Sequence, residues 1–178
     1  MESTATLRER LRATFRWNEA GGADPTAWWL DAHLRADLVD ALAGLHRSSS
    51  ITAVVGVSSR GFILGSLVAA TLGVGFVEVR KDQRGDRHGK ALLRRTTPPD
   101  YAQRDLVLTL RRGLLGARDH VLMVDDWIET GAQATAASRL AQDAGASWFG
   151  VAAVVDATTA AVRRALSVRS ILSVRELE

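Results

Sequence analysis

The sequence predicts an α/β fold, with a central parallel sheet flanked by helices, and three observations support this prediction. Short apolar runs rich in β-branched residues, such as residues 51–57 (ITAVVGV), are typical of strands buried on both faces. Longer apolar segments that end at a glycine, such as residues 62–72 before Gly73, indicate helices. The two kinds of segment alternate along the chain, and strands that alternate with helices pair in parallel.

The periodicity of the apolar residues predicts the elements in order. Leu7, Leu11 and Phe15 recur at helical spacing and predict an amphipathic helix, and a second apolar stripe runs from Leu34 to Leu45. After these helices we expect strands at residues 51–57, 74–79, 106–110, 121–124, 149–155 and 171–174, and helices at residues 62–72, 130–144 and 160–166. Residues 80–104 have no clear period, and loops of this length in compact domains are usually functional or disordered.

Length and composition restrict the class of protein. The chain has 178 residues, 47% hydrophobic and 24% charged, which suits one domain with a real core and is too apolar for disorder. It contains no apolar run long enough for a membrane span, no apolar stretch typical of a secretion signal near its start, and no cysteine for disulfides, thiolate metal sites or nucleophiles. We therefore expect a single domain over residues 1–178, in the cytoplasm.

The basic residues are mostly arginines, because Lys81 and Lys90 are the only lysines in a chain of net charge +3. Such a chain could bind nucleic acid or a small polyphosphate. No recognisable DNA-reading helix pair precedes residue 51, which argues against nucleic acid. His33, His46 and His120 have no spacing that indicates a metal site or a catalytic triad, and we expect them at the surface.

The strongest functional pattern follows the strand predicted at residues 121–124. Asp125 and Asp126 come directly after that strand, at the edge of the sheet where ligands bind in open α/β folds. Thr130 and Gly131 then begin a helix whose free backbone N–H groups and dipole favour an anion. Carboxylates for sugar hydroxyls, followed by amides for a phosphate, predict a sugar-phosphate site.

Residues 121–133 (VLMVDDWIETGAQ) resemble the phosphoribosyl pyrophosphate signature of type I phosphoribosyltransferases. That signature has four apolar residues, two acids, two apolar residues, a variable residue, Thr-Gly, a small residue and usually Thr or Ser. The run matches through Gly131 and departs at Gln133, where a hydroxyl normally contacts the 5-phosphate. The resemblance implies that Thr130, Gly131, Ala132 and Gln133 bind substrate. Receiver domains of response regulators also have an Asp-Asp strand end, but a lysine follows there, and none follows Asp126.

A second strand end, residues 57–65 (VSSRGFILG), resembles the Ser-Arg-Gly-Phe turn of adenine phosphoribosyltransferases. In that family the turn holds pyrophosphate, which implies this role for Ser59, Arg60 and Gly61. Residues 72–81 (LGVGFVEVRK) are similar to the family's next strand, which ends in the same Arg80–Lys81 pair. In the family the loop that follows closes over the pyrophosphate, so the resemblance implies a flexible lid at residues 80–104 that includes Arg84, Gly85, Arg87, His88 and Gly89.

The resemblance implies a Mg²⁺-dependent transfer of the 5-phosphoribosyl group from phosphoribosyl pyrophosphate to a purine-type base. Asp125 and Asp126 would orient the ribose hydroxyls and would contact the metal only indirectly, through ribose or water. The family also implies a hood over the base, formed here by residues 1–48 and 157–178, and a homodimer.

Base activation is the point at which the sequence departs most from adenine-specific relatives. Those members carry a glutamate in the lid, whereas residues 98–105 (PPDYAQRD) have a tyrosine and no glutamate. Glu129 stands before Thr-Gly, where hypoxanthine-guanine enzymes have an aspartate that handles the proton at purine N7, so it is the candidate general acid or base. The alternative for Glu129 is a solvent-facing residue favoured by the helix dipole. Trp127 either forms an apolar wall for a flat base or packs in the core.

Two other functions remain open at this point. A non-catalytic regulator on the same fold could sense phosphoribosyl pyrophosphate, and Gln133 and the missing lid glutamate favour it. Glu129, Asp125 and Asp126 favour the enzyme. The acceptor could also be orotate or another pyrimidine, but the Ser-Arg-Gly-Phe block argues against that.

Overall fold

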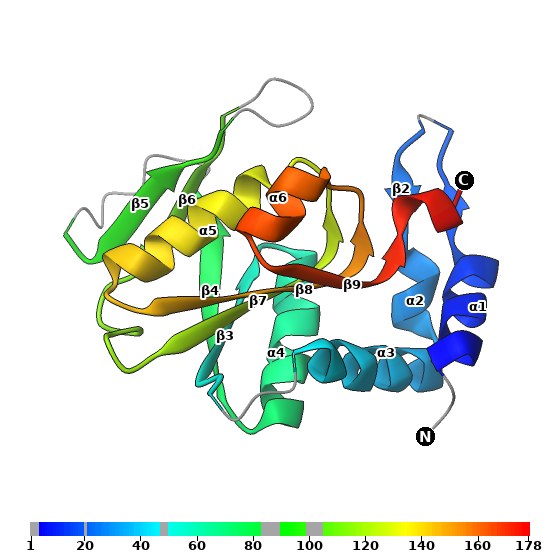
Figure 1. The fold of residues 1–178 in the computed structure, drawn as a ribbon, viewed down its shortest axis with the longest axis horizontal. Coiled ribbons are helices and arrows are strands. Elements are labelled where there is room, and N and C mark those ends of the chain that lie inside the picture. The colour runs from blue at the N-terminus through cyan, green and yellow to red at the C-terminus, as the bar shows by residue number, and fades with distance from the viewer. Residues whose placement is uncertain (1–3, 20, 47–49, 83–89, 99–104) are drawn as a thin grey trace.

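The computed structural model describes residues 4–19, 21–46, 50–82, 90–98 and 105–178. Its centre is a seven-stranded sheet in the order β5-β6-β4-β3-β7-β8-β9, and a two-stranded ribbon, β1-β2, lies apart from it (Figure 1). The strands are β1 (Arg16–Trp17), β2 (Ala23–Asp24), β3 (Ala53–Val57), β4 (Gly75–Lys81), β5 (Leu92–Thr96), β6 (Val107–Arg111), β7 (His120–Ile128), β8 (Ser147–Asp156) and β9 (Val168–Ser173). The helices are α1 (Thr4–Thr14), α2 (Thr26–Leu30), α3 (Ala32–Leu45), α4 (Arg60–Leu72), α5 (Ala132–Asp143), α6 (Ala160–Ala165) and the 3₁₀ turn η1 (Val174–Glu176).

The middle of the sheet is parallel, as the alternation of strands and helices predicts. β3 pairs in parallel with β4 and β7, and β7-β8-β9 continue in parallel. Every residue of β3 is buried, because helices cover both of its faces. The carboxyl ends of β3 and β7 therefore meet at one edge of the sheet.

The two faces of the sheet carry two separate hydrophobic layers. α5 and α6 pack on one face through side chains that include Ala137, Leu140 and Leu166. α3 and α4 cover the other face, and α1 and α2 pack against α3 beside it (Figure 1). The last residues of the chain return to α1, where Arg8 forms an ion pair with Glu176.

The structure differs from the sequence predictions at the edge of the sheet. Within residues 80–104, which we expected to be a loop, residues 80 and 81 complete β4 and residues 92–96 form β5. β5 and β6 pair antiparallel, so the sheet is mixed at this edge. The lid residues Arg84, Gly85, Arg87, His88, Gly89 and the tyrosine at 101 lie outside the described residues, and the lid role stays a prediction.

Two further expectations need correction. β7 does not end before the acidic pair but continues to Ile128, because β8 pairs with it as far as Asp156. His46, expected at the surface, is 4% exposed and its Nε2 lies 3.0 Å from the carbonyl oxygen of Val151. Within the described part of the chain, no helix is both long and apolar enough to span a membrane.

Candidate active site

The turn between β3 and α4 brings the helix close to its own strand. A Cβ on Gly56 would lie 2.1 Å from the carbonyl oxygen of Gly61, so only glycine fits at residue 56. The peptide bond between Ser58 and Ser59 is cis. Ser59 and Arg60 are exposed and Gly61 is buried. This turn places the start of α4, with its free amides, at the edge of the sheet.

The acidic pair of β7 lies directly opposite this turn. Arg60 Nε is 2.6 Å from the Oδ2 atom of Asp126, whose side chain is only 4% exposed while that of Arg60 is 48% exposed. A Cβ on Gly61 would lie 3.3 Å from Asp125 Oδ1, so α4 also touches the other acid. The two motifs found separately in the sequence therefore form one site.

The two aspartates have different electrostatic environments. Asp125 Oδ1 accepts a hydrogen bond from the backbone N–H of Asp126 at 3.0 Å. Burial, and then the negative charge of Asp126, raise the pKa of the Asp125 carboxyl well above its ordinary value. The raised pKa favours the neutral form of the Asp125 carboxyl, while Arg60 supplies the cation that faces Asp126.

The turn between β7 and α5 forms the second arm of the site. Gly131 has φ of +73°, and a Cβ there would lie 2.5 Å from Val162 Cγ1 in α6. Thr130 Oγ1 accepts from the amide of Ala132 at 3.2 Å, and the next two amides, of Gln133 and Ala134, belong to the free first turn of α5. These amides suit an anion. Glu129 and Thr130 are exposed beside them.

Arg80 and Lys81 are near this edge but do not converge on it. Successive strand residues point to opposite faces, so Arg80 lies on the α4 side, with its guanidinium carbon 5.6 Å from the centroid of the Phe62 ring. Its Nε donates to Glu78 Oε2 at 2.7 Å. Lys81 contacts the β3–α4 turn through its backbone, which donates to Ser58 Oγ at 3.0 Å.

Trp127 belongs to an aromatic cluster, defined here as Phe15, Trp17, Trp28, Trp29 and Trp127. Its ring is stacked on Phe15 with centroids 6.0 Å apart and an angle of 18° between the planes. Trp17 meets it edge-on, at 5.9 Å and 80°. Phe15 and Trp17 lie within residues 1–48, the expected hood, but neither carries a local sequence signal for contact with Trp127, because only the fold brings them to β7.

Asp24, on β2, is another residue near the site that the sequence analysis missed. Hydrogen bonds from Thr26 lower the pKa of its carboxyl, and the positive charge of Arg60 lowers it slightly further. The short ribbon therefore lies within electrostatic range of Arg60. Its only sequence signal was the turn composition around Gly21, Gly22 and Pro25.

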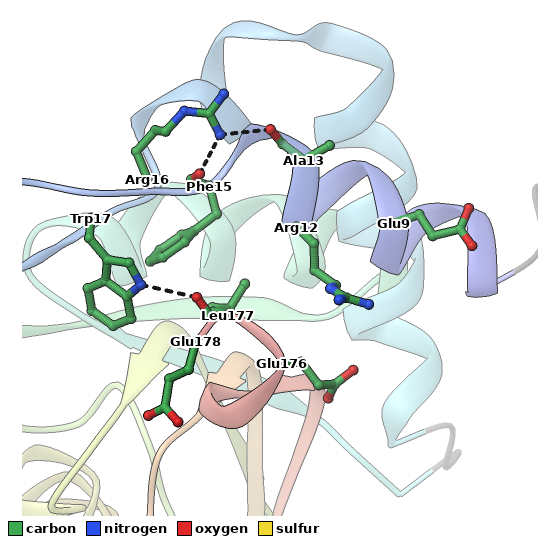
Figure 2. Close-up of a pocket in the computed structure, with 9 residues that line it drawn as sticks. All are labelled: Glu9, Arg12, Ala13, Phe15, Arg16, Trp17, Glu176, Leu177 and Glu178. Carbon is green, nitrogen blue, oxygen red and sulfur yellow. Dashed lines mark hydrogen bonds between the residues drawn. The ribbon is translucent and has the colours of Figure 1, made fainter.

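A groove of about 560 Å³ lies beyond the aromatic cluster, between α1 and the C-terminal residues (Figure 2). It is lined by Glu9, Arg12, Ala13, Phe15, Arg16, Trp17, Glu176, Leu177 and Glu178. None of the residues of the two strand-end turns takes part in it. Trp17 and Phe15 belong to both the groove and the aromatic cluster.

Comparison with known proteins gives a consistent result. The family model described as "Phosphoribosyl transferase domain" matches residues 30–175. An adenine phosphoribosyltransferase of Kineococcus radiotolerans is 38% identical over 133 residues, 75% of this chain and 69% of the relative. The crystal structure of adenine phosphoribosyltransferase from Rhodothermus marinus superposes with a TM-score of 0.81 and 28% identity, covering 95% of this chain and 99% of that one. The Trypanosoma brucei enzyme, solved with AMP, pyrophosphate and ribose-5-phosphate, shares the fold at 22% identity and a TM-score of 0.80, covering 100% and 84%.

Proposed function

The chain belongs to the phosphoribosyl transferase domain family, and we propose that adenine is its acceptor base and that the ends of β3 and β7 bind its phosphoribosyl donor. As a member of this family it moves the 5-phosphoribosyl group from phosphoribosyl pyrophosphate to a purine-type base and releases pyrophosphate, a reaction of purine salvage. The bond from ribose C1 to the pyrophosphate oxygen breaks, and a bond from C1 to a ring nitrogen forms. The ring nitrogen's proton must leave.

The contact between Arg60 and Asp126 is the observation that best supports the proposed donor site. It joins the Ser-Arg-Gly-Phe turn to the acidic strand across neighbouring parallel strands. A guanidinium that is half exposed can bind a pyrophosphate oxygen on its open side, while the acids beside it accept from ribose hydroxyls. Ser59 and Gly61 supply the start of α4, and Lys81 lies beside the β3–α4 turn, where its backbone N–H donates to Ser58 Oγ.

The transition state of such a transfer resembles an oxocarbenium ion, by analogy with glycoside chemistry. Asp125 and Asp126 are placed to favour positive charge on the ribose ring while they fix its hydroxyls. At the other arm, the free first-turn amides of Gln133 and Ala134 suit the 5-phosphate, while the amide of Ala132 donates to Thr130 Oγ1. The close packing of Gly131 on α6 keeps those amides in position.

The acidic pair fits Mg²⁺ that arrives with the substrate. Carboxylate oxygens are ligands that Mg²⁺ prefers, and the ion usually takes one or two carboxylates together with waters and substrate phosphates. Among the described residues, no group of three or more His, Asp or Glu side chains is arranged to hold a metal. When bound, the ion would neutralise the departing pyrophosphate, and Asp125 and Asp126 would reach it through ribose oxygens or water.

The acceptor side consists of Trp127 and Glu129, which flank Ile128 at the end of β7. The indole of Trp127 is partly buried and offers a flat wall for a purine. Glu129 is exposed and suits a general acid or base for the ring nitrogen's proton. Adenine is proposed because relatives covering most of this chain carry that name.

We also propose a homodimer. Ile63 and Leu67 are 45% and 38% exposed, lie one turn apart on α4, and follow Arg60 directly, so a second copy that covered them would sit beside the donor site. Light scattering of the wild-type chain and of Ile63→Glu tests this proposal, and a monomeric wild type contradicts it. The cytoplasmic location stays a prediction.

A regulator and an enzyme on this fold would both bind phosphoribosyl pyrophosphate, so the two functions are distinguished by whether the protein turns over a purine. Some arginines of α1 that could serve nucleic acid are already paired, Arg8 with Glu176 and Arg10 with Asp37. In calorimetry with Mg²⁺, we expect phosphoribosyl pyrophosphate to bind and adenine to give reaction heat, with AMP and pyrophosphate as products. Donor binding without turnover on any purine would favour the regulator.

Glu129→Gln tests the acid-base assignment. We expect kcat to fall by about 10²–10⁴-fold, the usual contribution of a positioned acid or base, with donor affinity unchanged. Glu9→Gln, another exposed glutamate, is the matched control. Turnover equal to wild type in Glu129→Gln would show that this residue is only a solvent-facing glutamate at the start of a helix.

A further inference from the structure

The indole of Trp17 contacts both stacked rings at the end of β7. It is perpendicular to Phe15, at 5.0 Å and 89°, and nearly perpendicular to Trp127, at 5.9 Å and 80°. Phe15 and Trp127 are themselves almost parallel. Phe15 therefore occupies one face of the Trp127 ring, and Trp17 crosses the edge of the stack and limits how far the two rings can slide.

Besides these ring contacts, the indole of Trp17 makes one hydrogen bond. Its Nε1–H donates to the carbonyl oxygen of Leu177 at 3.1 Å, while 43% of the residue is exposed. Trp17 also lines the groove described above, together with Phe15 and Leu177 (Figure 2). Trp28 shows the contrast, because it is fully buried and its Nε1–H donates to Leu11.

The acceptor of this bond is itself held in place. Leu177 follows η1, where Glu176 accepts from the backbone N–H of Ser173 at 2.9 Å and pairs with Arg8 of α1. The end of the chain is therefore tied to α1 on one side and to the Trp17 ring on the other. A contact remote in sequence from β7 thus determines the position of the ring beside Trp127.

From this geometry we infer that Trp17, held by the carbonyl of Leu177, is a positioning residue. It keeps the Trp127 ring in the orientation that forms a wall of the base site, and it thereby determines the affinity for the acceptor base. The inference rests on the proposed function, since it takes Trp127 as part of the acceptor site. The donor is bound by the two strand-end turns, which Trp17 does not touch. Loss of the Trp17 bond should therefore weaken base binding and leave donor binding unchanged.

Trp17→Phe is the decisive variant, because it keeps an aromatic ring and removes the N–H; the acceptor is a backbone carbonyl that substitution cannot remove. We expect the Kd and KM for adenine to rise by about three- to tenfold, as for loss of one hydrogen bond, and more in Trp17→Ala. The Kd for phosphoribosyl pyrophosphate and kcat should stay within about twofold of wild type. Trp148→Phe is the matched control, since the Trp148 Nε1–H also donates to a backbone carbonyl, that of Leu166 at 3.2 Å, and Trp148 pairs with Val121 at the opposite end of β7 from Trp127. Equal adenine affinity in Trp17→Phe and wild type, or an equal loss for both substrates, overturns the inference.

A second readout does not depend on turnover. The full chain contains five tryptophans, so 5-fluorotryptophan labelling gives a ¹⁹F spectrum in which Trp127→Phe assigns one resonance. The Trp127 resonance should shift or broaden in Trp17→Phe and stay in place in Trp148→Phe. An unmoved resonance overturns the positioning role. If the resonance moves but no purine is turned over, the proposed acceptor fails while the positioning role stands.

Discussion

The two sides of the substrate site are built in different ways. The strand-end turns, residues 58–61 and 129–132, are short contiguous segments whose function depends on backbone: free amides, a positive φ and glycines that allow close approach. The aromatic cluster draws its rings from β1, α2, β7 and Phe15, which lies between α1 and β1, and its geometry depends on side-chain packing across the molecule. In the proposed site, the donor would therefore be held by local structure and the base by tertiary structure.

This difference has a consequence for variation within the fold. A turn fixed by glycine and backbone hydrogen bonds tolerates little change, because a single Cβ displaces a helix. A cluster of rings can change its size and shape through one substitution without disturbing the sheet. Changes at the turns should therefore abolish activity or folding, while changes in the cluster should alter the choice and affinity of the base.

The largest effect is expected at the acidic pair. Asp126→Asn removes the charge that faces Arg60 and the developing ribose cation, and we expect kcat/KM to fall by about 10²–10³-fold, as when a preorganised electrostatic contact is lost. Asp37→Asn, which breaks a similar pair with Arg10 far from the site, is the control and should leave turnover near wild type. Steady-state kinetics at saturating donor measures both. A loss below about tenfold in Asp126→Asn would refute the role of the pair.

Gly131→Ala tests why the turn between β7 and α5 requires glycine: for its positive φ alone, or also because α6 lies too close for a Cβ. Gly131 and Gly73 both have positive φ, +73° and +69°, but only Gly131 would place a Cβ against another side chain, 2.5 Å from Val162. We expect Gly73→Ala to lower the unfolding free energy by about 1 kcal/mol and Gly131→Ala by about 1–3 kcal/mol more. Urea unfolding gives both values. Val162→Ala in the Gly131→Ala background should recover part of the difference, and equal losses in the two single variants would show that close approach is unimportant.

Gln133→Thr tests the one position at which the β7–α5 turn departs from the family signature. A hydroxyl at residue 133 can contact the 5-phosphate, so we expect the KM for phosphoribosyl pyrophosphate to fall by about three- to tenfold, the value of one hydrogen bond. The KM for adenine should not change. Gln142→Thr, at the exposed end of the same helix, controls for helix propensity. An unchanged or higher donor KM would mean that the amides alone hold the phosphate.

The same difference explains what the sequence could predict. The two turns were identified because each is a contiguous run, in which an apolar strand is followed directly by its polar residues. Their meeting, with Arg60 against Asp126, follows from parallel pairing of neighbouring strands. β5 was missed because Leu92–Thr96 is a short mixed run with two arginines at the edge of the sheet. The family resemblance implied a hood from residues 1–48 over the base, but it did not identify Phe15 and Trp17 as the neighbours of Trp127, since no local pattern relates β7 to these two residues.

His46 was expected at the surface and is buried, and the reason is again a contact between segments distant in sequence. It directly follows the last residue of α3, and its Nε2 lies 3.0 Å from the carbonyl oxygen of Val151 in β8. Nothing in its local sequence distinguishes it from His33 or His120, because its burial results from β8. A Cβ on Gly150 would lie 3.0 Å from its ring, which shows how closely the two elements approach there.

This burial predicts a pH dependence of stability that is smaller than the effects above. Burial is the main cause that lowers the pKa of His46, against a weaker opposing contribution from Val151. As pH falls, the His46 imidazole is therefore protonated in the unfolded chain at a higher pH than in the folded chain. Its contribution to the unfolding free energy is complete above about pH 6.5 and is lost as pH falls toward the folded pKa. The unfolding free energy should decrease over that window with a slope of at most about 1.4 kcal/mol per pH unit, the limit for one proton.

His46→Gln keeps an amide that can donate to Val151 and removes the titration. Urea unfolding between pH 7.5 and 5 should therefore show a flatter profile for His46→Gln than for wild type, while the exposed His120→Gln should keep the wild-type slope. If His46→Gln and wild type lose stability in parallel, the acid sensitivity lies elsewhere. If the profile flattens and adenine affinity at pH 6 improves relative to wild type, the contact between α3 and β8 also supports the aromatic cluster. The base side would then depend on a further contact distant in sequence, in keeping with its tertiary origin.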